Sequence, residues 1–337
     1  MTMPKRIAVI DVSHWHSTYD ASYLRILQSL ERDIVGVSDR DAAIAADRAA
    51  RFNSVPFTDY REMIERTKPE FVIALGRHSE MPETFRYLVG AGVPFIMEKP
   101  WGVDAETVAG LVRLAEEKGA WVGAPFFTRT MFWAQEAKRR LEAGEFGRLS
   151  HMVFRMIRPT MQRYVEWDSP WMNSLAVAGG GSLVNLGSHG FDIARFITGE
   201  EPEVVSAVIS NAVHQEEVED YAHVTLRFPS GLIFHNEVGY TMPTWPKNST
   251  DGEQKVAGER LLLRTVPQGV HLLAPNRDEV VAPPEGFQSG FGTIVRETLE
   301  AYGRGEPPPV GPRELLQAVR LIHQAYAIAR PRQPQQV

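Results

Sequence analysis

The first 123 residues alternate between short apolar runs and segments with helical periodicity. The apolar runs suit buried strands and cover residues 6–10, 33–39, 55–57, 71–75, 94–97 and 121–123. The helical segments cover residues 19–30, 41–52, 59–67, 82–90 and 104–118. Because parallel strands need such crossovers, the alternation predicts an α/β fold with a doubly wound parallel sheet of the Rossmann type.

From about Pro125 the pattern changes to longer alternating segments that are typical of an antiparallel sheet. These segments cover residues 149–157, 204–211, 222–228, 232–238 and 259–264, and the run from Pro229 to Gly231 predicts a hairpin turn. A glycine-led helix is expected over residues 182–198 and a closing helix over residues 312–329. We therefore expect a Rossmann domain over residues 1–123, followed by an α+β domain with a mostly antiparallel open sheet over residues 124–337.

Composition excludes several classes of function. The 337-residue chain has a net charge of -6, which favours neither nucleic acid nor an anionic membrane as a partner. It has no cysteine, which excludes disulfides, thiolate metal sites and a cysteine nucleophile. The apolar runs are too short to cross a bilayer, and the N-terminus lacks the apolar length of a signal peptide. We expect a cytoplasmic enzyme.

The turn after the first expected strand departs from the dinucleotide-binding pattern. A glycine-rich turn normally lets backbone amides and a helix N-terminus approach the diphosphate of the cofactor. Here Asp11, Ser13 and His16 occupy the places of the three glycines. Two interpretations remain open. Either Ser13, His14, Trp15 and His16 still hold the cofactor in an altered turn, or this unit has lost its nucleotide.

Polar residues also follow the second and fourth expected strands. Asp39 ends the second strand, where a carboxylate accepts hydrogen bonds from the adenosine ribose and repels a 2′-phosphate. NAD is therefore favoured over NADP, although the adjacent Arg40 weakens this preference because an arginine can receive a 2′-phosphate. Gly76, Arg77 and His78 follow the fourth strand and are expected on the nicotinamide side of the same sheet edge.

Glu98-Lys99-Pro100 follows the expected strand at residues 94–97. This position delivers Lys99 to the carboxyl edge of the sheet, where open α/β sheets bind their ligands. Beside a nicotinamide, a lysine can donate a hydrogen bond to a substrate oxygen, and the proline fixes the backbone that follows. For an isolated tripeptide, a surface lysine at a strand end would be the simpler interpretation.

A second polar group lies in the helix expected at residues 182–198. Asn185, His189 and Asp192 recur at intervals that place them on one face of an α-helix. An amide and a carboxylate near a histidine can fix its tautomer and tune its pKa, which suits a catalytic base. A metal site is disfavoured, because His189 and Asp192 are only two candidate ligands.

Taken together, these motifs resemble the glucose-fructose oxidoreductase/inositol dehydrogenase (Gfo/Idh/MocA) family. That family combines Glu-Lys-Pro at a strand end with the pattern W…G-G-G-x-L-x-D-x-G-x-H-x-x-D. Here the second pattern begins at Trp171, continues through the glycines at 179–181 and ends at Asp192. The resemblance covers most of the chain, and the combination of motifs is specific.

The resemblance implies roles for individual residues. Lys99 and His189 match the catalytic lysine and histidine, and Asn185 stands where an aspartate is usual. Glu98 and Lys99 are expected beside the nicotinamide. Arg129 matches an arginine that commonly follows the last Rossmann strand, and it is expected to line the substrate pocket together with Trp171.

The implied reaction is reversible hydride transfer between NAD and a hydroxyl of a sugar, polyol or sugar acid. Two alternatives remain open. Tightly bound NAD could be recycled in a net isomerisation, epimerisation or glycoside cleavage, or the chain could sense a sugar or dinucleotide without turnover. The altered turn favours the sensor, whereas Lys99 and His189 favour an enzyme. The resemblance also implies a homodimer or homotetramer formed through the C-terminal sheet.

Overall fold

The structure, a computed structural model, describes residues 3–243 and 250–329, and its contacts divide the chain into two compact units. Unit 1 comprises Met1–Phe127, Gln162–Gly179 and Gln288–Leu316. Unit 2 comprises Thr128–Met161, Gly180–Phe287 and Gln317–Val337. This division differs from the two consecutive domains expected over residues 1–123 and 124–337, because two later segments pack with the first part of the chain.

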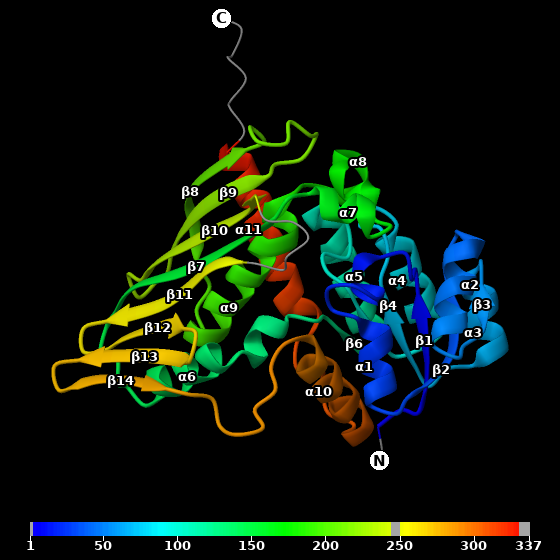
Figure 1. The fold of residues 1–337 in the computed structure, drawn as a ribbon, viewed down its shortest axis with the longest axis horizontal. Helices are drawn as coiled ribbons and strands as arrows, with labels where there is room; N and C mark the ends of the chain where they lie inside the picture. Colours follow the sequence, from blue (N-terminus) through cyan, green and yellow to red (C-terminus); the bar gives the residue numbers. More distant parts are fainter. Residues whose placement is uncertain (1–2, 244–249, 330–337) are drawn as a thin grey trace, which may run out of the picture. The chain divides into compact units, whose positions relative to one another are not determined.

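Unit 1 contains a six-stranded parallel sheet with the strand order β3-β2-β1-β4-β5-β6 (Figure 1). Its strands are β1 (Arg6–Ile10), β2 (Asp33–Ser38), β3 (Pro56–Phe57), β4 (Phe71–Ala74), β5 (Phe95–Met97) and β6 (Val122–Gly123). The strand order reverses between β1 and β4, and in open α/β sheets ligands bind in the crevice at such a switch point. The predicted Rossmann-type sheet is confirmed.

Helices surround this sheet and complete its core. They are α1 (Tyr23–Ser29), α2 (Ala42–Arg51), α3 (Tyr60–Thr67), α4 (Met81–Gly90), α5 (Ala105–Lys118), α7 (Gln162–Glu166), α8 (Leu175–Ala178) and α10 (Phe291–Arg304). Leu24 and Leu27 of α1 share one buried cluster with Val295 and Leu299 of α10 and with residues of β1 and β4. Helix α10 was not predicted from the sequence, and the core of unit 1 thus depends on a helix from near the end of the chain.

Unit 2 contains an eight-stranded sheet with the order β14-β13-β12-β11-β7-β10-β9-β8. Its strands are β7 (Leu149–Pro159), β8 (Glu203–Ser210), β9 (Tyr221–Arg227), β10 (Ile233–Met242), β11 (Asp251–Gly258), β12 (Leu262–Val266), β13 (Gly269–Ala274) and β14 (Arg277–Val281). All neighbours are antiparallel except β7 and β10. The mostly antiparallel sheet is confirmed, as is the turn at residues 229–231. The strand expected over 259–264 was misplaced, because the amide of Gly258 bonds to the carbonyl of Leu261 and forms a turn there.

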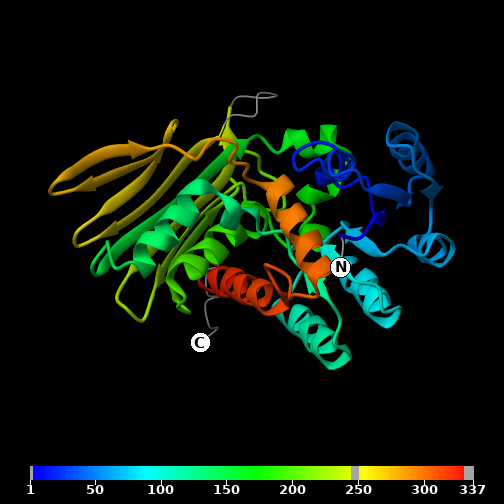
Figure 2. The same ribbon diagram turned by 90° about the horizontal axis from the view of Figure 1, so that it is seen from below.

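The helices of unit 2 are α6 (Phe132–Glu142) and α9 (Ser188–Thr198), joined by most of α11 (Pro312–Ala329), and they lie on one face of this sheet (Figure 2). In the described residues the opposite face carries no helix (Figure 2). Buried residues alternate along the strands with half-buried ones, as at Phe154 and Arg155 of β7. The oligomer expected through this sheet stays a prediction.

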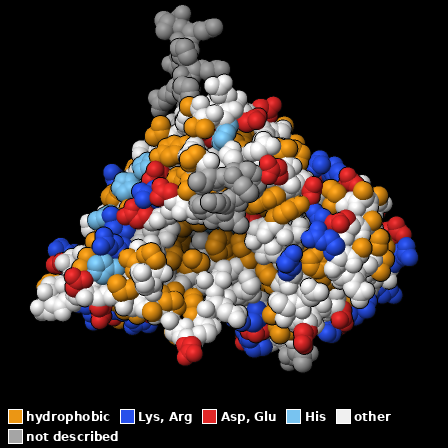
Figure 3. Space-filling model, viewed as in Figure 1, with side chains coloured by type: hydrophobic (Ala, Val, Ile, Leu, Met, Phe, Trp, Pro, Cys, Tyr) orange, Lys and Arg blue, Asp and Glu red, His pale blue; other side chains and the backbone are white. Residues whose placement is uncertain are grey.

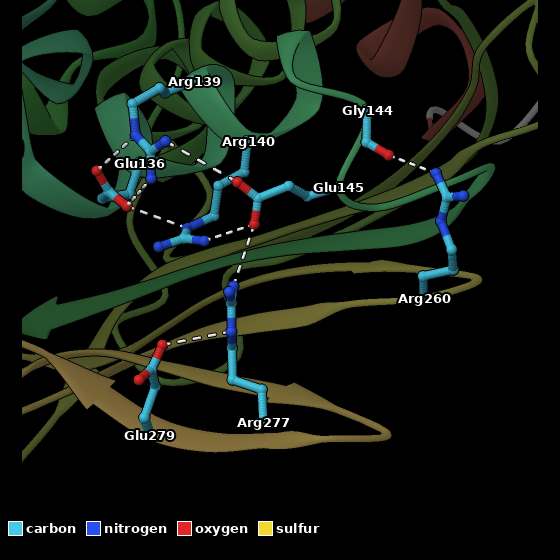
Figure 4. A network of polar contacts seen from close by, with 8 residues as sticks. All are labelled: Glu136, Arg139, Arg140, Gly144, Glu145, Arg260, Arg277 and Glu279. Carbon is cyan, nitrogen blue, oxygen red and sulfur yellow. Dashed lines mark hydrogen bonds and ion pairs between the residues drawn. The ribbon is translucent and has the colours of Figure 1, made fainter.

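An ion-pair network ties α6 to the edge of the sheet (Figure 4). Arg140 is buried, and it donates to Glu136 at 3.0 Å and to Glu145 at 2.6 Å. Glu145 also receives a hydrogen bond of 3.1 Å from Arg277 of β14. Since these groups share partners and one of them is buried, the network stabilises the packing more than isolated surface pairs would.

The molecular surface mixes charges of both signs. On the face drawn in Figure 3, basic and acidic side chains are interspersed, which fits a chain with 36 lysines and arginines and 42 aspartates and glutamates. Within residues 3–243 and 250–329, no helix has the length and apolar character needed to cross a bilayer.

A buried carboxylate fixes the chain just before α9. Glu219 accepts hydrogen bonds from the amides of Gly181 at 2.9 Å and Leu183 at 2.8 Å, and from the hydroxyl of Tyr326 at 2.8 Å. The backbone of Gly181 lies so close that a Cβ there would be 1.9 Å from the carbonyl oxygen of Glu219. This close approach explains the last of the three consecutive glycines.

We predict that Gly181→Ala lowers the free energy of unfolding by about 3 kcal/mol, because the added methyl group would displace backbone rather than a flexible side chain. Gly292→Ala is the matched control, since nothing beyond the adjoining backbone of its own helix lies within 4 Å of the Cβ position there. It should leave stability unchanged or raise it by up to about 1 kcal/mol. Urea unfolding of both variants measures the difference. Equal stability of the two variants would contradict the assignment.

Candidate active site

Asp39 closes the turn that follows β1. It lies directly after β2, close to its predicted place at the strand end, and it is buried. One carboxylate oxygen accepts the amide of Ser13 at 2.6 Å, and the other accepts the amide of Asp41 at 3.0 Å. The amide of Ser13 would be a donor to phosphate in a glycine-rich turn, but in this structure it is bonded to Asp39.

The rest of the turn is filled by aromatic and imidazole rings. His14, Trp15 and His16 are all buried, and the ring of His14 stacks on that of Trp15 at 3.8 Å between centroids. The amide of His16 donates to Nδ1 of His14 at 3.1 Å. Trp15–Ser17 form only a short 3₁₀ turn, and α1 begins at Tyr23, later than the sequence predicted. No long helix starts where the diphosphate is normally held.

The segment Gln162–Gly179 packs onto this turn within unit 1. The ring centroid of Trp171 lies 5.9 Å from that of His14 and 5.0 Å from that of His78. The hydroxyl of Ser169 donates to the carbonyl of Ser13 at 3.0 Å. The structure therefore brings Trp171, which the sequence assigned to the substrate, together with His14 and His78, which it assigned to the cofactor.

Little space is left beside these rings. A cavity of about 10 Å³ is lined by Asp11, Ser13, His14, Arg40, Gly76, Arg77, Glu80 and Trp171. This volume holds about one water molecule. A larger pocket of about 450 Å³ lies at the ends of β1, β2 and β3, and its lining includes Asp11, Asp39, Arg40, Tyr60 and Glu80. The second volume is in the range of small-ligand sites.

The carboxylates of Asp11 and Glu80 line both cavities. Asp11 has a left-handed backbone with φ of 58°, and its carboxylate lies 2.7 Å from the Cβ position of Gly76. Burial, Asp39 and Glu80 raise the pKa of Asp11 to about 7, against the opposing charges of Arg40 and Arg77. Glu80 forms ion pairs with Arg40 and, at 4.0 Å, with Arg77. Neither Asp11 nor Glu80 was assigned to the site from the sequence.

Lys99 lies at the carboxyl edge directly after β5 and is 1% exposed. The Lys99–Pro100 peptide bond is cis. Burial lowers the pKa of Lys99 to about 8, while the charges of Glu98 and Asp20 act in the opposite direction. Glu98 is itself buried, and it accepts hydrogen bonds from Nδ1 of His16 at 2.8 Å and from the hydroxyl of Tyr23 at 2.6 Å.

His78 is neutral in this environment. Its Nδ1 donates to the carbonyl of Ala178 at 2.7 Å, which fixes the tautomer with the proton on Nδ1. Burial and the charge of Lys99 lower the pKa of His78 to about 3. Its expected place at the end of β4 is the one observed, but the ring is turned into the protein and is fully buried.

In unit 2, the polar residues around His189 are held by different partners. Asn185 lies in a π-helix, Leu183–Gly187, so the α-helical spacing assumed from the sequence applies only from Ser188 onward. The amide of Asn185 donates to the hydroxyl of Tyr240 at 2.9 Å. π-Helical turns inside α-helices are frequent at functional sites. The contact with Tyr240 had no sequence signal, because the two residues are far apart in the chain.

His189 and Asp192 are both buried on α9. Asp192 binds Nε and Nη2 of Arg129 at 2.8 and 2.5 Å. Arg129, expected in the substrate pocket, therefore makes a bidentate pair with Asp192, and its substrate role stays a prediction. Across the described part of the chain, no three histidine, aspartate or glutamate side chains are grouped so that they could hold a metal ion.

Two family models match the chain. Residues 5–126 match the oxidoreductase family with an NAD-binding Rossmann fold, and residues 134–260 match the GFO/IDH/MocA C-terminal domain. The first of these models describes a class of NAD-binding oxidoreductases. Together the two matches show that the chain belongs to the Gfo/Idh/MocA oxidoreductase family, as the sequence motifs predicted.

Curated relatives match part of the chain. A trans-1,2-dihydrobenzene-1,2-diol dehydrogenase from Mus musculus is 28% identical over 62% of this chain and 61% of its own length. A myo-inositol dehydrogenase from Streptomyces leeuwenhoekii is 28% identical over 66% of this chain and 65% of its own length. The match to the mouse protein thus covers about three-fifths of that protein.

Solved structures share the fold over nearly the whole chain. An aldose-aldose oxidoreductase from Caulobacter crescentus, complexed with glycerol, has a TM-score of 0.81 and 19% identity over 96% of both chains. The WlbA dehydrogenase from Bordetella pertussis, in complex with NADH and UDP-GlcNAcA, has a TM-score of 0.79 and 21% identity over 97% of both chains. At these identities the likeness concerns the fold.

The residues of unit 1 fit a dinucleotide in part. Asp39 and the pocket of about 450 Å³ suit the adenosine ribose. The amide cradle for the diphosphate is missing from the turn at Asp11–Ser17, since the amide of Ser13 is bonded to Asp39 and Asp11 stands in place of the first glycine. Any diphosphate bound here would depend on Arg40 and Arg77 and would be opposed by an ionised Asp11.

We predict that Asp11→Asn stabilises the protein at pH 8 and has little effect on stability near pH 4. The pKa of Asp11 rises from 3.8 to about 7 on folding, so wild-type stability is lost as the pH rises between these values. Asparagine keeps the shape, tolerates the left-handed backbone and cannot ionise. The gain at pH 8 should be on the order of 2 kcal/mol.

Urea unfolding at a series of pH values checks this prediction. Asp33→Asn is the control, because the side chain of Asp33 is 58% exposed, and its effect should not grow with pH. A difference between Asp11→Asn and wild type that stays constant from pH 5 to pH 8 would contradict the raised pKa of Asp11.

Proposed function

We propose that this chain is an oxidoreductase that transfers a hydride between the nicotinamide of NAD and a hydroxyl of a sugar, polyol or sugar acid. The observation that carries the proposal is Lys99, a buried lysine at the carboxyl edge of a parallel sheet with a pKa of about 8. A group with this pKa exchanges a proton near neutral pH, as acid–base chemistry on an alcohol requires. Family membership supports the choice of redox chemistry.

NAD, when bound, accepts or supplies the hydride. We assign the adenosine ribose to Asp39, whose charge favours NAD over NADP. Gly76, Arg77 and His78 follow β4 on the other side of the switch point, so they are our candidates for the nicotinamide side. Ser13, His14, Trp15 and Arg40 stay candidates for the remaining cofactor contacts.

The acid–base roles are assigned residue by residue. His189 would take the proton of the substrate hydroxyl, and Lys99 would stabilise the oxygen as its charge develops. Asn185 can orient that oxygen through its amide but cannot carry a proton. Trp171 and Arg129 are the candidates for binding the rest of the substrate, the tryptophan through its ring face and the arginine through its guanidinium group.

Relatives support a hydroxyl-bearing substrate, since they include enzymes named for a dihydrobenzene diol and for myo-inositol. A protein that senses a sugar or a dinucleotide without turnover is the second candidate. The rings that fill the turn after β1, beside a cavity of about 10 Å³, favour it. We also expect a cytoplasmic homodimer or homotetramer formed through the open face of the β7–β14 sheet.

We predict that Lys99→Met and His189→Gln each lower kcat by about a hundredfold or more with a sugar or polyol substrate. The Kd for NAD should change little, because both groups are assigned to proton chemistry. Lys118→Met, at an exposed lysine in the last turn of α5, is the control and should keep full activity. A panel of sugars and polyols with NADH absorbance as the readout provides the assay. A Lys99 or His189 variant that retains most of its turnover would remove that residue from the mechanism.

We predict that wild-type affinity for NAD falls between pH 6 and pH 8, because Asp11 with a pKa of about 7 becomes charged near the diphosphate. A change of roughly tenfold is expected from one nearby like charge. Asp11→Asn should bind NAD equally well at both pH values and more tightly than wild type at pH 8. Asp39→Ala should weaken NAD more than NADP. Calorimetry measures each of these affinities. Absence of wild-type binding at millimolar NAD at both pH values would favour a sensor that does not bind NAD.

A further inference from the structure

His16 occupies the place of the third glycine and reaches the residue next to the catalytic lysine. Its Nδ1 donates to Oε1 of Glu98 at 2.8 Å, across 82 positions of sequence. The imidazole is 4% exposed and Glu98 is 2% exposed, so water does not compete for this bond. Within unit 1, the altered turn is thus joined directly to the Glu98-Lys99-Pro100 motif.

Other groups hold the imidazole in this orientation. The ring centroid of His16 lies 4.9 Å from that of Phe291, at the start of α10, and 4.8 Å from that of Trp15. The hydroxyl of Tyr23 donates to the same oxygen of Glu98 at 2.6 Å. Since two donors from the turn and from α1 converge on one carboxylate oxygen, the position of Glu98 is fixed from two directions.

A glycine could not make this contact, and a bulky residue normally could not occupy this place. The third glycine of the usual turn allows the first helix to pack closely on the sheet. Here α1 begins only at Tyr23, so the chain between β1 and α1 has room for a buried imidazole. The same residue, His16, thus replaces the usual glycine and supplies a hydrogen-bond partner to Glu98.

We infer that His16 is a positioning residue for Lys99 and that it acts through Glu98. The inference rests on the proposed function only in calling Lys99 catalytic. His16 anchors the carboxylate, and the anchored carboxylate places a negative charge beside the lysine. His16 is thereby assigned to the catalytic lysine rather than to the cofactor diphosphate.

The electrostatic interactions among His16, Glu98 and Lys99 agree with this role. Burial alone would raise the pKa of Glu98, but the charge of His16, its hydrogen bond and the charge of Lys99 hold that pKa well below its usual range. Glu98 in turn raises the pKa of Lys99 against the effect of burial. The charged and titratable groups that act on the pair are His14, His16, Asp20, Tyr23 and His78.

The first test measures the proton affinity of Lys99 and needs no substrate. Protein labelled with ¹³C at the lysine ε-carbon is titrated by NMR, and Lys99→Met identifies the signal. Glu98→Gln removes the charge, so the pKa of Lys99 should fall. His16→Phe keeps a ring against Phe291 but removes the donor, so the carboxylate is released and the pKa should fall by a smaller amount. His16→Asn keeps a donor near the place of Nδ1 but carries no charge, so it should recover part of the pKa of Lys99 that His16→Phe loses.

Failure of this test is distinguishable from failure of the proposed function. A pKa of Lys99 that is unchanged in His16→Phe overturns the inference, whether or not any substrate is turned over. If His16→Phe does not fold, Glu98→Gln is measured instead. An unchanged pKa of Lys99 in Glu98→Gln would also overturn the inference. His151→Leu, at a half-buried histidine of β7 in unit 2, is the control and should leave the Lys99 titration unchanged.

The second test is kinetic and uses the substrate found in the sugar panel. His16→Phe should lower kcat about tenfold or more and leave the Kd for NAD unchanged, while His16→Asn recovers most of kcat. If His16 acts only through Glu98, the double variant His16→Phe/Glu98→Gln should be no slower than Glu98→Gln alone. Additive losses, or a loss confined to NAD affinity, would overturn the inference.

Discussion

Every parallel strand of unit 1 ends at the same edge of its sheet, and this constraint determines which side chains can meet there. The ends of β1, β2, β4 and β5 deliver Asp11, Asp39, Gly76 and Lys99 to one place, however far apart these residues are in sequence. Because the place is largely buried, each polar group there needs a partner or must change its protonation state. Asp39 binds amides, Glu98 binds an imidazole and a phenol, and Asp11 lacks enough donors to stay ionised at low cost.

The fold could be predicted largely from the sequence, because strand and helix alternation is a local signal. The end of β5 could be placed, and Lys99 with it, since the edge of a parallel sheet follows from chain direction alone. Non-local partners could not be predicted. Nothing in the sequence pairs His16 with Glu98, Asn185 with Tyr240 or Arg129 with Asp192, because these contacts depend on how separate segments pack.

The α-helical face assumed for Asn185, His189 and Asp192 shows a second limit of prediction from sequence. A period of 3.6 residues is the reasonable assumption for any helix, but Leu183–Gly187 form a π-helix that changes the angle between Asn185 and the residues after it. Gly187 and Gly190 let Asn236 of β10 pack closely against this segment, since a Cβ at either position would lie within 3.5 Å of its side chain. The assumed spacing therefore holds for His189 and Asp192 on α9 and fails for Asn185.

Unit 1 is built from three separate segments of the chain, and this has a consequence for folding during synthesis. Its core includes Val295 and Leu299 of α10, and its carboxyl edge is covered by Trp171. A ribosome that has released only the first 123 residues has therefore exposed a sheet whose apolar surface still lacks the helix that covers it. The Rossmann unit can finish folding only when α10 has emerged from the ribosome. Until then, the nascent chain must remain soluble with the apolar surface of its first strands partly uncovered.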